Sequence, residues 1–285
     1  TLDNTSGTVD YELGATDVLS DDYYNLRIRG GGTAKTLQGD VNVAGDLVID
    51  GGHELNLGSN TITITGLSEI NGVLNTGSGE CTANGYSDID GTLNVGTGTY
   101  DANGTFDATS GAVTFTDAGR LELAGTVTSL GTFTPSTGKV IYNGGAQNVL
   151  AETYNDLTIR FAGDKTAIGN VNVNNNFVIR TNATYDIAST TTTVTGTTYV
   201  NTTGTLSLST GTFDANGEFD ATGGTVFAGV AETGSLELGS TVTSLGTFGG
   251  PSSTLLFDGS SAQTINAASV NAGNLIVNNA SGVTL

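Results

Sequence analysis

Apolar and small polar residues alternate along most of this chain with a period of two. The pattern is clear in VNVAGDLVI (41–49), ELNLGSNTITITG (54–66) and GTLSLSTGTF (204–213). Each run is short and ends at Gly, Asn or Asp, which are common turn residues. A period of two is typical of a strand with one buried face. Because no run has the spacing and caps of a helix, the pattern predicts an all-β fold of many short strands without substantial helix.

The same alternation returns at a fixed interval of 19 residues. GLSEINGVLNTGSGECTAN (66–84) aligns with GYSDIDGTLNVGTGTYDAN (85–103), and GTFDATSG opens a further copy at Gly104. The alignment also places Cys81 opposite Tyr100. It forms columns of glycine (Gly66, Gly85, Gly104), acid (Glu69, Asp88, Asp107), leucine (Leu74, Leu93) and asparagine (Asn84, Asn103). We expect each column to be a set of neighbours in the folded chain.

A longer repeat encloses the short one. SGTVDYELGATDVLSDDYYNLRI (6–28) returns as STGKVIYNGGAQNVLAETYNDLTI (136–159) and again as SSTLLFDGSSAQTINAASVNAGNLIV (252–277). TGTYDANGTFDATSG (97–111) likewise returns as TGTFDANGEFDATGG (210–224). These copies divide the chain into super-repeats at approximately 6–135 and 136–251, with a partial third at 252–285.

Repeats of this length, built from short strands and turns, indicate stacked coils. A coil of 19 residues has room for three strands, and each coil would lie on the previous one at about 4.8 Å, the spacing of neighbouring strands. We therefore predict a single parallel β-solenoid (β-helix) that runs continuously over 1–285, with about 15 coils of about 19 residues. Its stability would come mainly from contacts between neighbouring coils.

The composition excludes some classes of partner and indicates where the protein is located. The 8 basic and 28 acidic residues give a net charge of −20, which is opposite to the basic footprint that nucleic-acid binding requires. No apolar run approaches the roughly 20 residues that cross a membrane. The sequence contains no Met, so Thr1 is not a translational start and we expect a processed chain or a piece of a longer one. An extracellular or cell-surface protein fits these features.

The acidic column is the candidate cation site. Stacking would align Glu69, Asp88 and Asp107 at one strand spacing, where like charges disfavour one another unless a cation or raised pKa values relieve them. Calcium prefers several oxygen ligands, and SDIDG (87–91) is a fragment of a calcium-loop pattern. The complete D-x-D-x-G loop does not repeat, however. Solvated acids on an outer face are the competing interpretation.

Threonines form a second candidate surface. T-x-T spacing occurs in TITITG (61–66), TTTTVTG (190–196) and the two TVTS segments (126–129 and 241–244). In this local motif the chain resembles the β-solenoid ice-binding proteins, in which a flat T-x-T array meets the ice lattice. The segments do not recur in every coil at one phase, and Thr also favours exposed strands in general. The sequence favours a structural role for them.

Residues for catalysis are sparse, and we do not expect an enzyme. His53 is the only histidine and lies between turn residues, with no nucleophile motif around it. A zinc site would need more ligands than His53 and Cys81. The basic residues are scattered along the chain rather than grouped with acids. No cofactor is predicted apart from the calcium considered above.

The segment YYNLRIRGGGTAKTLQGDVNVAGDLVIDGGHELNLGSNTITITG (23–66) resembles repeats of large bacterial surface and secreted proteins of adhesin type. Those repeats have a Y-x-N-L start, a K-T-L step, a G-x-V-x-V-x-G-x-L-x-I strand pair and an N-T-I-T stretch. The resemblance implies an extracellular structural or adhesive role, as a filament subunit or an adhesin stalk, without catalytic residues. An ice-binding or calcium-dependent glycan-binding solenoid is the alternative.

The ends of the chain suggest a partner. The segments 6–28 and 252–277 are copies of each other, and neither resembles a dedicated cap. Open coils expose unpaired strand edges, which a solenoid normally covers. We therefore expect self-association through the terminal coils, with a surface or glycan ligand as a possible second partner.

Overall fold

The computed structural model describes residues 5–12, 17–30, 34–227, 229, 232–265 and 269–284. Within these ranges every regular element is a β-strand, and the strands pair in parallel. The chain forms a β-solenoid of about 13 turns. This confirms the all-β parallel solenoid that the alternating pattern predicts.

Many turns of the solenoid are longer than the short repeat predicts. Ser68 pairs with Ser87, which is the interval of that repeat. Leu26 pairs with Leu47, and Phe213 pairs with Leu236, at longer intervals along the sequence. The extra residues lie between the strands, so the chain makes fewer turns than the 15 that a uniform repeat would give.

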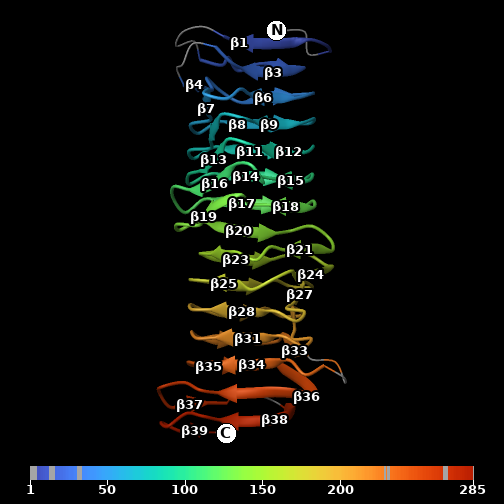
Figure 1. Ribbon diagram of the computed structural model, residues 1–285, viewed down its shortest axis with the longest axis vertical. Coiled ribbons are helices and arrows are strands. Elements are labelled where there is room, and N and C mark those ends of the chain that lie inside the picture. The colour runs from blue at the N-terminus through green and yellow to red at the C-terminus, as the bar shows by residue number, and fades with distance from the viewer. Residues whose placement is uncertain are drawn as a thin grey trace. The chain divides into compact units, whose positions relative to one another are not determined.

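The chain divides into two compact units, residues 1–140 and 141–285. The strands of unit 1 form three walls, a, b and c, which Figure 1 shows as stacked arrows. Wall a contains β1 (Thr8–Tyr11), β3 (Asn25–Ile28), β6 (Leu47–Ile49), β9 (Ser68–Ile70), β12 (Ser87–Ile89), β15 (Phe106–Asp107) and β18 (Val127–Ser129). Wall b contains β2 (Asp22–Tyr23), β5 (Val41–Val43), β8 (Thr61–Ile64), β11 (Glu80–Ala83), β14 (Thr99–Ala102) and β17 (Arg120–Leu123). Wall c contains β4 (Lys35–Thr36), β7 (Glu54–Asn56), β10 (Val73–Asn75), β13 (Thr92–Val95), β16 (Ala112–Phe115) and β19 (Thr132–Thr134).

Unit 2 follows the same scheme with walls d, e and f, and β20 (Lys139–Tyr142) spans the division. Wall d contains β23 (Asp156–Ile159), β26 (Phe177–Ile179), β29 (Thr198–Val200), β32 (Phe219–Asp220) and β35 (Val242–Ser244). Wall e contains β21 (Gln147–Val149), β24 (Asp164–Ala167), β27 (Thr184–Asp186), β30 (Thr205–Ser207) and β33 (Thr225–Phe227). Wall f contains β22 (Thr153–Tyr154), β25 (Val171–Val173), β28 (Thr191–Val194), β31 (Thr212–Ala215) and β34 (Ser235–Leu238).

The last strands of unit 2 join two of these walls. β36 (Thr247–Phe257) pairs with β33 through its first half and with β34 through its second half. β38 (Ser269–Val277) then pairs along β36. β37 (Gln263–Thr264) pairs with β39 (Val283–Thr284).

Alternate residues of each strand point into a thin apolar core. On wall b the register places Cys81 between Ile62 and Tyr100, and all three are fully buried. The predicted pairing of Cys81 with Tyr100 is therefore confirmed. Burial raises the pKa of the Cys81 thiol, and a buried, protonated thiol is unreactive. Cys81 is a packing residue.

The glycine column marks a corner where successive turns touch through their backbones. A Cβ atom on Gly85 would lie 2.1 Å from the carbonyl oxygen of Gly66, and one on Gly104 would lie 2.0 Å from that of Gly85. No side chain fits at such distances. The repeated glycine is required by the close approach of one coil to the next.

The repeated segment TGTYDANGTFDATSG builds the same turn in both units. The Thr109 amide and hydroxyl donate to Asp107 Oδ1 at 2.9 and 2.5 Å. The Thr222 amide and hydroxyl donate to Asp220 Oδ1 at 2.9 and 2.6 Å. A register irregularity follows Phe106 on wall a and Phe219 on wall d. This repeated motif is thus a structural turn.

Candidate functional site

The acidic column forms as the sequence predicts. Asp88 pairs with Glu69 on one side and with Asp107 on the other, in β9, β12 and β15 of wall a. All three residues lie on the outward face and are half-buried, whereas their neighbours Ser87 and Ile89 point inward and are buried. The three carboxylates therefore follow one another at successive strand positions.

The two outer acids of the column are held by local hydrogen bonds. Asn71 Nδ2 donates to Glu69 Oε1 at 2.6 Å, and Asp107 accepts the two bonds from Thr109. The pKa of the central Asp88 is raised, chiefly by burial. The negative charges of Asp90, Asp107 and Glu69 raise it further. Burial and these neighbours therefore disfavour the charged form of Asp88.

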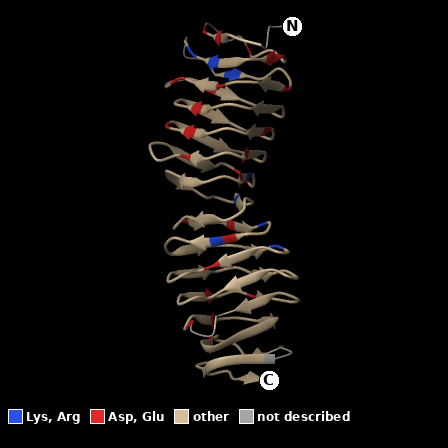
Figure 2. Cartoon of the chain, turned by 90° about the vertical axis from the view of Figure 1, so that its right-hand side faces the viewer, with Lys and Arg blue, Asp and Glu red and all other residues tan. Residues whose placement is uncertain are grey.

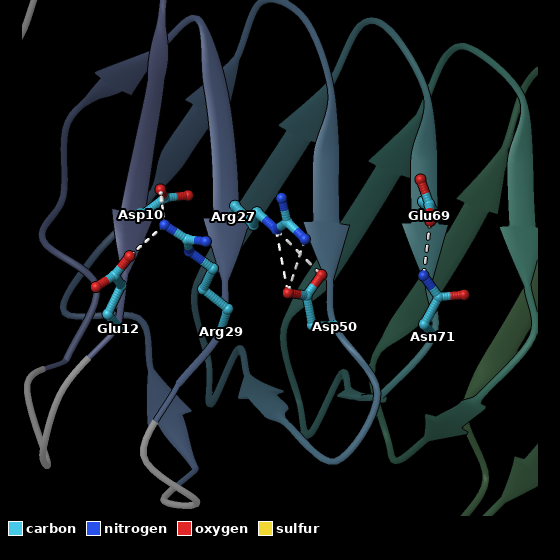
Figure 3. A network of polar contacts seen from close by, with 7 residues as sticks. All are labelled: Asp10, Glu12, Arg27, Arg29, Asp50, Glu69 and Asn71. Carbon is cyan, nitrogen blue, oxygen red and sulfur yellow. Dashed lines mark hydrogen bonds and ion pairs between the residues drawn. The ribbon is translucent and has the colours of Figure 1, made fainter.

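The same outward row begins with residues of both charges. The register runs from Asp10 to Arg27 and then to Val48 before it reaches Glu69. Figure 3 shows Arg27 facing Asp50, with Nε and Nη2 donating to the carboxylate at 2.9 to 3.1 Å. Arg29 lies between Asp10 and Glu12 and pairs with both (Figure 3). Here the charges of wall a compensate one another, whereas from Glu69 onwards they do not.

The geometry does not gather a cation cage around the column. Across the described residues, no group of three or more His, Cys, Asp or Glu side chains is arranged to hold a metal ion. On wall d the counterpart Asp220 has Tyr199 and Ser244 as its register neighbours, so the acidic column belongs to unit 1. Cation binding by Glu69, Asp88 and Asp107 stays a prediction.

The T-x-T pairs do not stack on one another. Thr61 and Thr63 of β8 pair with Glu80 and Thr82 of β11. On wall e, four successive members of one column are threonines, namely Thr184, Thr205, Thr225 and Thr247, and the column continues to Asp164 at one end and to Ser269 at the other. The parallel column beside it contains Asp186, Ser207, Phe227 and Gly249. The threonine row is therefore one residue wide.

His53 lies in the backbone turn before β7. Its amide donates to the Asp50 carbonyl at 3.1 Å, and its carbonyl accepts from the Val73 amide at 2.8 Å. The residue is half-buried. Its described contacts are those of a turn residue.

Two lysines prove to be interior residues, which the sequence did not suggest. Lys35 and Lys165 are 1% and 0% exposed. Lys165 Nζ donates to the carbonyl oxygens of Phe161, Ala162 and Gly163 at 2.8, 3.4 and 3.2 Å. Burial lowers the pKa of Lys165, and the carbonyls compensate its desolvation. The sequence did contain a signal for this burial, because Lys35–Thr36 and Lys165–Thr166 occupy equivalent positions in the two copies of the super-repeat.

The outer surface carries mostly negative charge. Figure 2 shows Lys and Arg at a few places among more numerous Asp and Glu. The burial of Lys35 and Lys165 reduces the exposed positive charge further. Such a surface repels phosphate backbones. In the part of the chain that the structure describes, no helix is long and apolar enough to cross a membrane.

A shallow groove on wall b was not predicted from the sequence. It has a volume of about 280 Å³ and lies over β2, β5 and β8. Its lining consists of Asp22, Tyr23, Asn42, Val43, Ala44, Thr63 and Thr65. The polar residues Asp22, Asn42 and Thr63 are register neighbours in one outward column. The sequence signal for this groove is a difference between copies: VNVAGD (41–46) becomes VNVNNN (171–176).

Comparison with known proteins gives a structural likeness. No family model and no curated protein matches the sequence. A solved structure of a TibC-catalysed, hyper-glycosylated TibA fragment matches at 15% identity, with 98% of this chain and 99% of that chain covered and a TM-score of 0.43. A likeness at this level identifies neither a family nor a function.

Proposed function

We propose that this protein is a structural extracellular β-solenoid of a bacterial surface, which assembles end to end as a filament subunit or serves as an adhesin stalk. The stacked-coil fold and the acidic outer surface support this role. The resemblance of residues 23–66 to adhesin-type repeats supports it as well. The repeated motifs are accounted for by turns and stacking.

The observation that carries the proposal is an uncovered row of core residues on β38. The register aligns Leu236, Leu255 and Leu275 in one inward column. Leu236 and Leu255 are 0% exposed, but Leu275 is 54% exposed. Val277, which pairs with the fully buried Phe257, is 52% exposed. A row of this kind is completed when another solenoid turn stacks on it.

The covering turn that we propose belongs to a second copy of the chain. Among the described strands β38 pairs with β36 alone, and a strand at the edge of a sheet favours the addition of a further strand. Apolar side chains that leave water contribute about 25 cal/mol per Å² of buried area. The combination of an open edge and an apolar row favours end-to-end stacking.

A charge on the inward row tests this proposal. Leu275→Asp places a carboxylate in the apolar contact, and we expect it to abolish the association that light scattering and electron microscopy detect in the wild-type chain. Ile276→Asp is the matched control, because Ile276 is 45% exposed but belongs to the outward face of the same strand.

The outcome separates the two forms of the proposal. Filaments of wild type and Ile276→Asp, but not of Leu275→Asp, support a filament subunit. A wild-type chain that stays monomeric at high concentration contradicts self-association. That result would leave the adhesin stalk as the form of the proposal.

The alternative functions make different predictions. An ice-binding solenoid would produce thermal hysteresis, and its face would include the threonine column of wall e, for example Thr205 and Thr225. A calcium-dependent glycan binder would lose its ligand in EDTA. Neither effect is expected of a structural module.

A further inference from the structure

We propose that the groove on wall b binds an uncharged sugar unit without the help of a metal ion. This proposal deepens the adhesive part of the proposed function and rests on it. Ligand clefts commonly have volumes of about 300–1,000 Å³, so a groove of about 280 Å³ fits a single small unit. The class of ligand follows from the chemistry of the lining.

The lining offers several hydrogen-bonding groups in a short column. Asn42 Nδ2 donates to Asp22 Oδ1 at 2.8 Å, which fixes the orientation of both side chains. The second carboxylate oxygen and the Asn42 carbonyl are acceptors, while the Thr63 and Thr65 hydroxyls both donate and accept. Neighbouring strands are about 4.8 Å apart. A ligand with several hydroxyl groups on adjacent carbons matches this array.

The aromatic residue Tyr24 is the register neighbour of Ala44, a small residue that lines the groove. The Ala44 and Gly45 amides donate to the Tyr23 and Tyr24 carbonyls at 2.9 and 2.6 Å, so the register continues past the strand ends and places Tyr24 beside Ala44. Tyr24 is 38% exposed. The apolar C–H face of a sugar ring packs against aromatic rings, while its hydroxyls reach polar groups.

The second copy of the super-repeat lacks these features. The Asn174 amide donates to the Tyr154 carbonyl at 2.9 Å, as Ala44 does to Tyr23, so Asn174 is the counterpart of Ala44. In the same alignment Tyr24 is replaced by Asn155. Unit 1 therefore differs from its own copy at Ala44, which lines the groove, and at Tyr24, the neighbour of Ala44 in the register.

Charge favours a neutral ligand. Asp22 lines the groove and the chain carries a net charge of −20, so an anionic sugar would be repelled. In the described ranges no three or more His, Cys, Asp or Glu side chains are grouped to hold a metal ion, and the proposed contacts are hydrogen bonds to the lining residues. Binding should therefore persist in EDTA, unlike that of a calcium-dependent lectin.

Two-dimensional amide NMR of the full chain tests the proposal. The probes are the methyl glycosides of glucose, galactose and mannose, with methyl glucuronide as the anionic control. We expect at least one neutral glycoside to shift the Asn42 side-chain amide and the Thr63 and Thr65 backbone amides in the presence of EDTA. Methyl glucuronide should leave these signals unchanged.

The two copies supply matched variants. Ala44→Asn places in the groove the side chain of its own counterpart, and we expect affinity to fall at least tenfold. Asn174→Ala makes the reverse change in unit 2 and should leave affinity unchanged. Tyr24→Asn, which likewise introduces the residue of the second copy, should weaken binding and provides a second reading if Ala44→Asn disturbs the fold.

Three results would overturn the proposal. These are the absence of shifts with all three neutral glycosides, shifts away from the groove, and equal affinity of wild type and the Ala44→Asn and Tyr24→Asn variants. The measurement is independent of end-to-end stacking, because Leu275→Asp leaves the groove intact. Sugar binding by Leu275→Asp with no filaments, or filaments with no sugar binding, shows which of the two proposals fails.

Discussion

Burial and the neighbouring acids disfavour the charged form of the Asp88 carboxylate. Its pKa is raised from the ordinary 3.8, so folding favours the protonated form. The stability that this contributes is fully present below the ordinary pKa and is lost as pH rises through the raised one. At neutral pH the ionised Asp88 therefore opposes folding.

Asp88→Asn should raise the melting temperature at pH 7, and the gain should disappear as the pH falls below 3.8. If the column binds a cation, millimolar calcium should raise the melting temperature of the wild type more than that of Asp88→Asn. Asp164→Asn removes one exposed charge from unit 2 and is the control. Equal calcium effects on all three proteins would contradict a cation site at this column.

At the scale of the element, the close contact between coils at the glycine corner restricts which residues can stand there. Gly85→Ala would place a Cβ 2.1 Å from the Gly66 carbonyl oxygen. We expect this change to lower the free energy of unfolding by at least about 2 kcal/mol, because the backbone of two coils must shift. Urea denaturation measures the loss.

Gly145→Ala is the control for this change, because no atom lies within 4 Å of its Cβ position and its φ is not positive. We expect its effect to stay within about 0.5 kcal/mol, as at other unstrained exposed sites. Similar losses for the two variants would show that the conformational entropy of glycine, and not the contact between coils, explains the column.

At the scale of the whole molecule, net charge opposes the proposed stacking. Each copy carries −20, and like-charged copies repel over the Debye length, which falls from about 30 Å at 0.01 M salt to about 3 Å at 1 M. The apolar row of β38 is not weakened by this screening. End-to-end association should therefore strengthen as NaCl is added.

Sedimentation velocity over this range of salt provides the measurement. The wild type should shift towards larger species at high salt, whereas Leu275→Asp should stay monomeric throughout. Dissociation of wild-type assemblies by added salt would instead indicate that ion pairs, and not the Leu275 row, hold the copies together.

The sequence by itself determined the class of fold and the neighbours within the regular repeat. A period of two assigns the inward and outward faces, and a constant interval makes residues such as Glu69, Asp88 and Asp107 partners. Where the chain keeps to that interval, as between Ser68 and Ser87, the predicted register is the observed one. Local periodicity is sufficient here because neighbouring coils repeat the same geometry.

The tertiary structure decided what depends on several turns at once. The longer coils, such as the one that pairs Phe213 with Leu236, set the number of turns, and periodicity within a strand does not specify the length of the loop that follows it. The groove at Ala44 is lined by residues from three successive turns. Lys165 is interior because the loop before it folds back over its ammonium group. Leu275 is likewise exposed because, among the described strands, β38 pairs with β36 alone. These features arise from packing between coils, which a pattern along one chain does not record.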